Sequence, residues 1–258
     1  MRSAILSTTL CIARAAIVAF SSGVAMADIV VIEAARDNTL IEKADGSKSN
    51  GSGPGIFVGR TSQPSGSIRR AVLDFIVANH VPAGATILSA ELHLHIQLGN
   101  SDPSLITPHR VLANWGEGAS SFNGGSGAPS VAPDTTWIHT FYDGLFWSQP
   151  GGDFSATASG SMTSHVASEV TWSSATMAAD VQQWLDDPAN EHGWLLLGDE
   201  STASTALQFA SREFGTLAER PTLVVEYATP VPGPGNWLVL GLVAAVLWVT
   251  RGVGSIAA

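Results

Sequence analysis

The stretch that most constrains the fold is residues 70–96, where apolar and polar residues alternate in two runs. In the second run, five apolar residues fall on one face of an extended strand, namely Leu88, Ala90, Leu92, Leu94 and Ile96. The other face carries Ser89, Glu91, His93 and His95. A period of two is typical of an antiparallel strand with one buried face.

The first run places Ala71, Leu73 and Phe75 on one face and Asp74 on the other. Between the two runs, residues 81–85 include a Pro and a Gly, which favour a turn. We therefore expect two strands joined by a turn that together form one wall of a β-sandwich core.

Short apolar runs bounded by turn-forming residues continue along the chain, at 28–34, 39–42, 56–59, 109–112, 166–172, 193–198, 206–211 and 222–227. One helix is expected over 176–185, because Met177, Val181 and Trp184 recur at helical spacing before Pro188. This pattern predicts an all-β, jelly-roll-type antiparallel β-sandwich with one short helix. We expect its core to contain Trp172, Trp184 and Trp194.

The first 27 residues have the features of a secretory signal peptide. Arg2 precedes an apolar stretch, and Ala25-Met26-Ala27 provides a small-residue cleavage site before Asp28. The chain has a single cysteine, Cys11, which lies in this segment. We therefore expect an exported mature protein without disulfide bonds.

The C-terminal end consists of a Pro/Gly linker, residues 229–236, and a hydrophobic sorting or anchor segment, residues 237–258. Val231-Pro232-Gly233-Pro234, the apolar run 237–249 and Arg251 resemble the PEP-CTERM sorting signals that exosortase handles in bacteria. The resemblance implies partners in the export and sorting machinery, and a place at the cell surface or in the extracellular matrix. The alternative for this segment is a plain C-terminal membrane anchor. The signal peptide and the C-terminal segments flank one domain, residues 28–228.

Charge is distributed unevenly along the chain. Three of the 12 Lys and Arg residues, Arg2, Arg14 and Arg251, lie in the end segments, whereas all 22 Asp and Glu residues lie between them. Nucleic acids and anionic lipids are bound by basic patches. We therefore expect no nucleic-acid partner. The excess of carboxylates would instead allow the domain surface to attract cations.

Several motifs of the domain resemble the DNRLRE-type domains. They are Asp37-Asn38-Thr39-Leu40, the run 73–92 with Val81-Pro82-Ala83-Gly84-Ala85, the run 181–197, and Arg220-Pro221-Thr222-Leu223. The resemblance implies a jelly-roll β-sandwich of secreted or surface proteins, some of which are carbohydrate-binding modules with alginate-type polyuronates among their ligands. This chain departs from the family at Thr39, which stands in place of Arg, and at a long insertion, residues 115–154.

Aromatic residues of the insertion are the candidate ligand-binding residues, because sugars stack on exposed rings. The candidates are Trp115, Trp137, Trp147 and Tyr142, with Arg110 nearby in sequence for an acidic sugar. The insertion itself, above all residues 119–134, has the composition of a surface loop. The alternative is that these rings fill the end of the sandwich core.

Oxygen-bearing residues in loops are candidate ligands for a structural Ca²⁺, which prefers carboxylate and amide oxygens. The set is Asp37, Asn38, Asp153 and Asp199. No EF-hand pattern is present, and solvated turn residues are the alternative interpretation. A second metal hypothesis uses His93 and His95, with His109 or His139 as a third ligand.

Motifs for catalysis are scarce. The chain has no G-x-S-x-G element, and its only cysteine lies in the signal segment. Glu117 and Asp153 could act as a carboxylate pair, which only separation in space identifies. The main hypothesis is an exported, non-catalytic surface or matrix domain that binds polysaccharide. The alternatives are a structural or adhesive matrix protein without a glycan ligand, and a polysaccharide-active enzyme.

Overall fold

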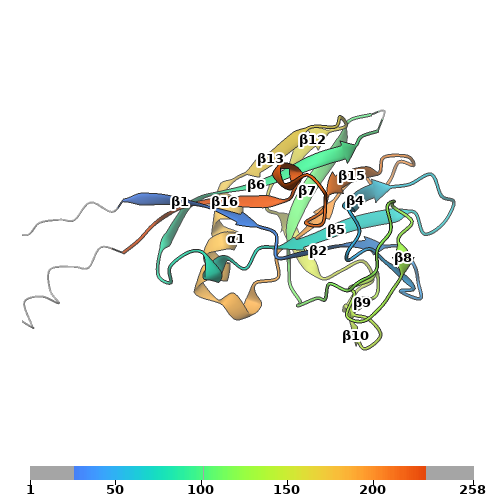
Figure 1. Cartoon of the computed structure of the whole chain (residues 1–258), viewed down its shortest axis with the longest axis horizontal. Helices are drawn as coiled ribbons and strands as arrows, with labels where there is room; N and C mark the ends of the chain where they lie inside the picture. Colours follow the sequence, from blue (N-terminus) through green and yellow to red (C-terminus); the bar gives the residue numbers. More distant parts are fainter. Residues whose placement is uncertain (1–25, 101, 231–258) are drawn as a thin grey trace, which may run out of the picture. The chain divides into compact units, whose positions relative to one another are not determined.

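The alternating stretch forms β6 (Thr86–Leu98), the longest strand among residues 26–100 and 102–230, which are the residues that the computed structural model describes. β6 pairs antiparallel with β16 (Thr222–Ala228), β13 (Glu169–Ser173) and β15 (Leu207–Ala210). β1 (Ala27–Glu33) lies on the outer edge of β16. Together these strands build the first layer of the fold (Figure 1).

The second layer is built around β5 (Ile68–Asp74). This strand pairs with β2 (Arg36–Ile41), β4 (Gly55–Arg60) and β14 (Trp194–Leu197). β5 and β6 therefore belong to different layers, and the expectation that they form one wall is wrong. The physical reason is the connection between them, where Ile76 adopts φ 54° before the 3₁₀ turn η1 (Val77–Asn79) and the chain crosses between layers.

Three further strands complete the second layer, namely β7 (Ser104–Val111), β11 (Phe154–Ala158) and β12 (Met162–Ser164). Every strand pair in the described part of the chain is antiparallel. β7 begins at Ser104, five residues before the apolar run expected at 109–112. Because β15 pairs with both β4 and β6, twelve strands form one connected sheet that folds into two layers. The prediction of an all-β antiparallel sandwich with one short helix is confirmed.

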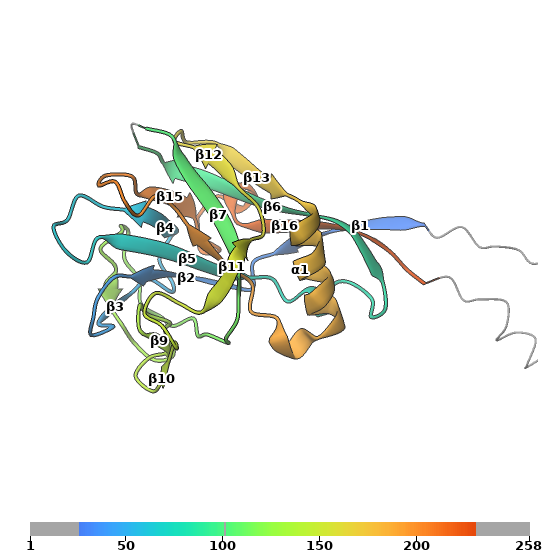
Figure 2. The same cartoon turned by 180° about the vertical axis from the view of Figure 1, so that it is seen from behind.

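The main core lies between the two layers. Its buried residues come from both layers and from the helix, and they include Trp172, Trp184 and Trp194, which expose 2% or less of their surface, as expected. The helix is α1 (Ala175–Asp186), which the side chain of Ser174 caps by accepting a hydrogen bond from the backbone N of Met177. α1 covers one end of the sandwich (Figure 2).

One residue of β6 departs from the expected alternation. Leu88 is 48% exposed, whereas Ile87 and Ala90 on either side of it are buried. The pairing register with β16 shifts at this point, where Glu226 faces Ser89 and Tyr227 faces Ile87. A β-bulge turns the side chain outward, because the extra residue breaks the period of two.

The insertion does not behave as an open surface loop. It folds over the outer face of the second layer, where Trp115, Trp137 and Trp147 pack on Leu40, Val72, Val111 and Leu195. Its short strands are β8 (Ala128–Pro129), which pairs with β3 (Lys48–Ser49), and the hairpin of β9 (His139–Phe141) and β10 (Leu145–Phe146). Figure 1 places β8, β9 and β10 beyond β2 and β5, away from β6 and β13, and Figure 2 shows β9 and β10 in the same place from behind. The chain therefore has a second core, between the insertion and the sheet.

The expected signal peptide before residue 26 and the expected C-terminal segment after residue 230 lie outside the described residues. Residues 26–230 form one compact unit, and two further 3₁₀ turns lie within it, η2 (Pro188–Asn190) and η3 (Leu217–Glu219). Among the residues described, no helix is both long and apolar enough to cross a membrane.

The second core provides a test of the fold. Trp115 is fully buried, its Nε1 donates a hydrogen bond of 2.9 Å to the carbonyl of His192, and the guanidinium of Arg36 lies 4.3 Å from its ring. We expect Trp115→Ala to lower the free energy of unfolding by about 3–5 kcal/mol, because it leaves a cavity and an unpaired carbonyl. Urea unfolding of the full chain measures this loss.

The matched control is Phe122→Ala in the same insertion, where the ring is 49% exposed. We expect this change to alter the free energy of unfolding by about 0.5 kcal/mol or less. Equal losses for the two variants would contradict a second core centred on Trp115.

Candidate functional site

The three tryptophans expected to offer exposed rings are buried. Trp115, Trp137 and Trp147 expose 0%, 9% and 5% of their surface. Trp147 Nε1 donates a hydrogen bond of 2.9 Å to the carbonyl of Thr136, so its polar atom is also used internally. The prediction that these rings are exposed for stacking on sugars is therefore wrong. They are hydrophobic anchors of the insertion.

Arg110 lies on the opposite side of the sheet from these tryptophans. Its Nε is 3.4 Å from Oδ1 of Asp180 on α1, whereas the next residue, Val111, packs in the second core. Adjacent residues of a strand point to opposite faces. Arg110 therefore cannot complete a site with the rings of the insertion. Tyr142 is half-buried, with its ring centre 5.2 Å from that of His139.

Asp153 and Asp199 each stabilise a turn of their own. Asp153 accepts hydrogen bonds from the backbone N of Ser148 (2.8 Å) and of Gln149 (3.1 Å). Asp199 accepts from Ser201 N (2.8 Å) and Oγ (2.6 Å), and these bonds lower its pKa to about 2. The expected calcium set of Asp37, Asn38, Asp153 and Asp199 is therefore wrong as a single site.

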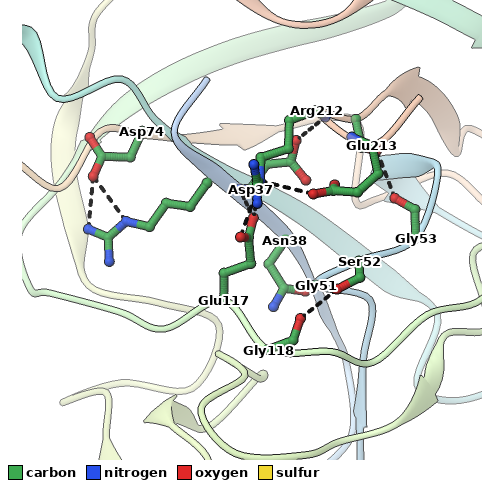
Figure 3. Close-up of polar contacts among 12 residues, drawn as sticks. Asp37, Asn38, Gly51, Ser52, Gly53, Asp74, Glu117, Gly118, Arg212 and Glu213 are labelled. Atoms are coloured by element: carbon green, nitrogen blue, oxygen red, sulfur yellow. Dashed lines mark hydrogen bonds and ion pairs between the residues drawn. The ribbon is translucent and has the colours of Figure 1, made fainter. Parts of the chain in front are cut away.

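Asp37 instead belongs to a different acidic group, with Glu117 and Glu213. One ligand atom of each residue lies within 4.8 Å of the others, and no other such group of three His, Cys, Asp or Glu side chains occurs in the described part of the chain. We call this group the acidic cluster. Asp37 comes from β2, Glu117 from the insertion and Glu213 from the turn after β15, so three distant segments meet there (Figure 3).

The cluster forms at the edge of β2 that has no strand partner. The backbone N of Asp37 donates a hydrogen bond of 2.6 Å to Oε1 of Glu117, where a neighbouring strand would otherwise accept it. The backbone N of Arg212 donates to Oδ2 of Asp37 at 2.7 Å. Side chains thus provide hydrogen-bond partners at the strand edge that has no neighbouring strand, and they bring the carboxylates together.

Arg212 is the cation of the cluster. Its Nε lies 3.0 Å from Oε1 of Glu117 and 2.9 Å from Oε1 of Glu213. These contacts, the hydrogen bond to Glu117 first among them, raise the pKa of Arg212. One guanidinium faces three carboxylates, so the cluster carries two negative charges in excess when all three are ionised.

Two oxygen atoms of the cluster are buried without a hydrogen-bond partner among the described residues. They are Oδ1 of Asp37 and Oε2 of Glu213. Burial, and then the nearby carboxylates of Glu213 and Glu117, raise the pKa of Asp37 well above its ordinary value. Burial also raises the pKa of Glu213, against the effect of Arg212. Unsatisfied buried carboxylate oxygens are costly to a fold, so they point to a missing partner.

A buried polar network beside the cluster fixes its geometry. Oδ1 of Asn38 accepts a hydrogen bond from Asn50 N (3.0 Å) and lies 2.9 Å from Ser49 Oγ. The single hydroxyl proton of Ser49 is shared between Asn38 Oδ1 and the carbonyl of Thr135, which is 2.8 Å away. Asn38 therefore joins β2 to the loop before β4 and to the insertion. Its amide oxygen is occupied by these donors, so Asn38 is a structural residue rather than a metal ligand.

Gly51 and Gly118 allow the two loops beside the cluster to touch. A Cβ atom on Gly51 would lie 2.7 Å from the carbonyl oxygen of Gly118 and 2.7 Å from Oδ1 of Asp134. Asp134 is fully buried and accepts a hydrogen bond from the backbone N of Gly118 at 3.0 Å. Any side chain at residue 51 would push the insertion, and Glu117 with it, away from β2.

The two carboxylates considered for catalysis are engaged in different contacts. Glu117 is held by Arg212, and Asp153 holds the turn at Ser148. The histidine hypothesis for a metal also finds no group of three in the described residues. His93 Nδ1 lies 2.9 Å from Glu169 Oε1 on the outer face of the sheet.

Two adjoining hollows lie between the insertion and the ends of β2 and β5. One, of about 420 Å³, is lined by Lys43, Trp137 and Ile138 among others, and the other, of about 400 Å³, by Arg70, Gln149 and Phe154 among others. Pro150 lines both, and we call the pair the Pro150 hollow.

Arg70 is fixed in the floor of this hollow, bound to both carboxylate oxygens of Glu200 and to the carbonyl of Gly151. Its guanidinium lies 4.8 Å from the ring centre of Trp137 and 5.5 Å from that of Phe154. These contacts hold the insertion against β5 and make the floor rigid. The carbonyl of Lys43 accepts a hydrogen bond from the backbone N of Gly46, but its side-chain ammonium makes no hydrogen bond or ion pair within the described residues.

Sequence reasoning identified Asp37 and Glu117 separately, but it missed Arg212 and Glu213. These two residues lie in an unremarkable turn between strands, and only the fold brings them to β2. Comparison adds no further assignment, because no protein-family model and no curated protein matches the chain.

The raised pKa of Asp37 predicts a pH dependence of stability. A carboxyl whose pKa is higher in the folded chain stabilises the fold while it is protonated, and that stability is lost as pH rises through the folded pKa. In EDTA, we expect Asp37→Asn to show a smaller loss of unfolding free energy than the wild type between about pH 5 and about pH 8. Urea unfolding across this range measures the difference.

Other groups also titrate in this range, so the comparison between variants matters more than the wild-type profile. Burial raises the pKa of Glu191 to about 7, which acts in the same direction as Asp37, and burial lowers the pKa of His139 and His192, which acts in the opposite direction. All three are unchanged in Asp37→Asn. Superimposable pH profiles of the variant and the wild type would contradict a raised pKa at Asp37.

Proposed function

We propose that the protein is an exported, non-catalytic surface or matrix module that binds polysaccharide in the Pro150 hollow. The observation that supports this proposal is the combination of an unpaired Lys43 and an exposed Gln149 above a rigid floor that includes Trp137. Because Arg70 already holds the floor rigid, little conformational entropy is lost on binding, which favours affinity.

The groups around the hollow match the chemistry of an acidic sugar chain. The ammonium of Lys43 is a donor for a carboxylate, and the amide of Gln149 both donates to and accepts from hydroxyl groups. Ile138 and Pro150 offer apolar surface for the C–H faces of sugar rings. The tryptophans contribute by shaping this hollow from beneath, and only Trp137 lines it.

The proposed location rests on the sequence. A signal peptide and a PEP-CTERM-like tail would take the module out of the cell, with the export and sorting machinery as transient partners. The surface or matrix of a bacterium is where a polysaccharide ligand would be met.

Affinity electrophoresis and calorimetry of the full chain, solubilised in mild detergent, test the binding of alginate, polygalacturonate, dextran and soluble cellulose fragments. EDTA is kept present, so that Ca²⁺ does not gel the acidic polymers. We expect binding of an acidic polymer that weakens with salt, because Lys43 acts as a charge. Lys43→Ala with Gln149→Ala should weaken it about tenfold, a loss of about 1.4 kcal/mol.

The matched control is Lys48→Ala, which removes the same charge from β3, outside the lining of the Pro150 hollow. If Lys48→Ala weakens binding as much as the double variant does, the effect of charge is not local to the Pro150 hollow. That result would contradict a site in the hollow. If no polymer binds, the polysaccharide proposal fails. The adhesive alternative would then be favoured by Leu145 and Phe146, which are 61% and 62% exposed on β10.

A further inference from the structure

The strongest unassigned feature outside the Pro150 hollow is the acidic cluster. It contains three carboxylates from three segments, with ligand atoms within 4.8 Å of one another. Acidic residues near each other are common without a ligand, so their proximity alone does not define a site. The contacts of the individual oxygen atoms decide whether the cluster is a ligand site.

Asp37 supplies the decisive observation. It is fully buried, and although its Oδ2 accepts a hydrogen bond from Arg212 N, its Oδ1 has no partner among the described residues. Oε2 of Glu213 is likewise buried without a partner. Figure 3 shows the carboxyl groups of Asp37, Glu117 and Glu213 gathered around the side chain of Arg212. Buried oxygens of this kind need a positive partner or a proton.

We propose that the acidic cluster of Asp37, Glu117 and Glu213 binds a divalent cation, Ca²⁺, that joins β2, the insertion and the turn after β15. Carboxylate oxygens are the ligands that Ca²⁺ prefers, and water completes its six to eight positions. Two charges in excess remain after Arg212 is counted, and a divalent ion neutralises both.

Access to the site and competition for it both involve Arg212. Its side chain is 38% exposed, and those of Glu117 and Glu213 are 16% and 25% exposed, so the cluster opens to solvent on this side. The guanidinium occupies carboxylate oxygens that an ion would use, and its positive charge repels the ion. Arg212 is therefore a built-in competitor that lowers the affinity for Ca²⁺ and supports the fold when the ion is absent.

The test uses the full chain in mild detergent, stripped with EDTA and dialysed. CaCl₂ is titrated by calorimetry, and the thermal midpoint is measured in Ca²⁺ and in EDTA. We expect one bound Ca²⁺ per chain, and a midpoint raised by about 5 °C or more at about 100 times the dissociation constant.

Two conservative variants locate the ion. Glu213→Gln and Asp37→Asn keep the shape of the side chains and remove one charge each, so each should weaken Ca²⁺ binding about tenfold or more, because charge count sets affinity. Asp199→Asn is the control, because it removes an exposed carboxylate that holds a separate turn. We expect it to keep the wild-type affinity for Ca²⁺.

Arg212→Gln separates an ion site from a purely structural cluster. If Arg212 competes with the ion, its replacement should lower the unfolding midpoint in EDTA and tighten Ca²⁺ binding at the same time. A structural ion pair alone would give the first effect without the second.

Three results would overturn the proposal. The first is that Ca²⁺ gives neither a heat of binding nor a shift of the unfolding midpoint, as expected if Asp37 is protonated and donates to Glu213. The second is that Ca²⁺ binds both Glu213→Gln and Asp37→Asn as tightly as the wild type. The third is that Mg²⁺, and not Ca²⁺, binds and raises the midpoint. The polysaccharide assay is run in EDTA, so its outcome is independent of these results.

Discussion

The structure depends on how the chain covers one edge and one face of β2. This strand pairs with β5 on one side only, and an uncovered strand edge with free N–H groups invites pairing with other chains. The chain covers the edge with side chains rather than with another strand, because Glu117 accepts from the backbone of Asp37. The same arrangement places three carboxylates close together, so the protected strand edge and the proposed cation site arise from the same contacts.

The insertion determines where the proposed polysaccharide site lies. By burying Trp115, Trp137 and Trp147 on the outer face of the sheet, it turns a face that would be solvated in a simple sandwich into an interior. The Pro150 hollow lies where this added layer meets the ends of β2 and β5. Arg70 makes the floor of this hollow rigid by joining Glu200, Gly151 and the ring of Trp137, as the proposed binding residues would require.

Local patterns predicted the elements better than their arrangement. The alternation in β6 and the spacing in α1 reflect one buried face each, so the sequence carries them directly. The layer to which β5 belongs depends on the path at Ile76, and no residue pattern encodes it. The aromatic residues of the insertion were ambiguous, because buried and exposed rings have the same sequence signature. Arg212 and Glu213 acquire their role only through long-range contacts, which a single sequence does not reveal.

The pairing of β1 with β16 has a mechanical consequence. Ala27 faces Ala228, so the two ends of the described unit leave it side by side, and β16 is hydrogen-bonded along both of its edges, to β1 and to β6. Ladder bonds run perpendicular to the strands. Tension applied beyond Ala228, while another part of the module is held, therefore acts in shear on two ladders at once instead of opening one bond after another. The last strand of the domain is therefore held by both of its neighbours against a pull along its length.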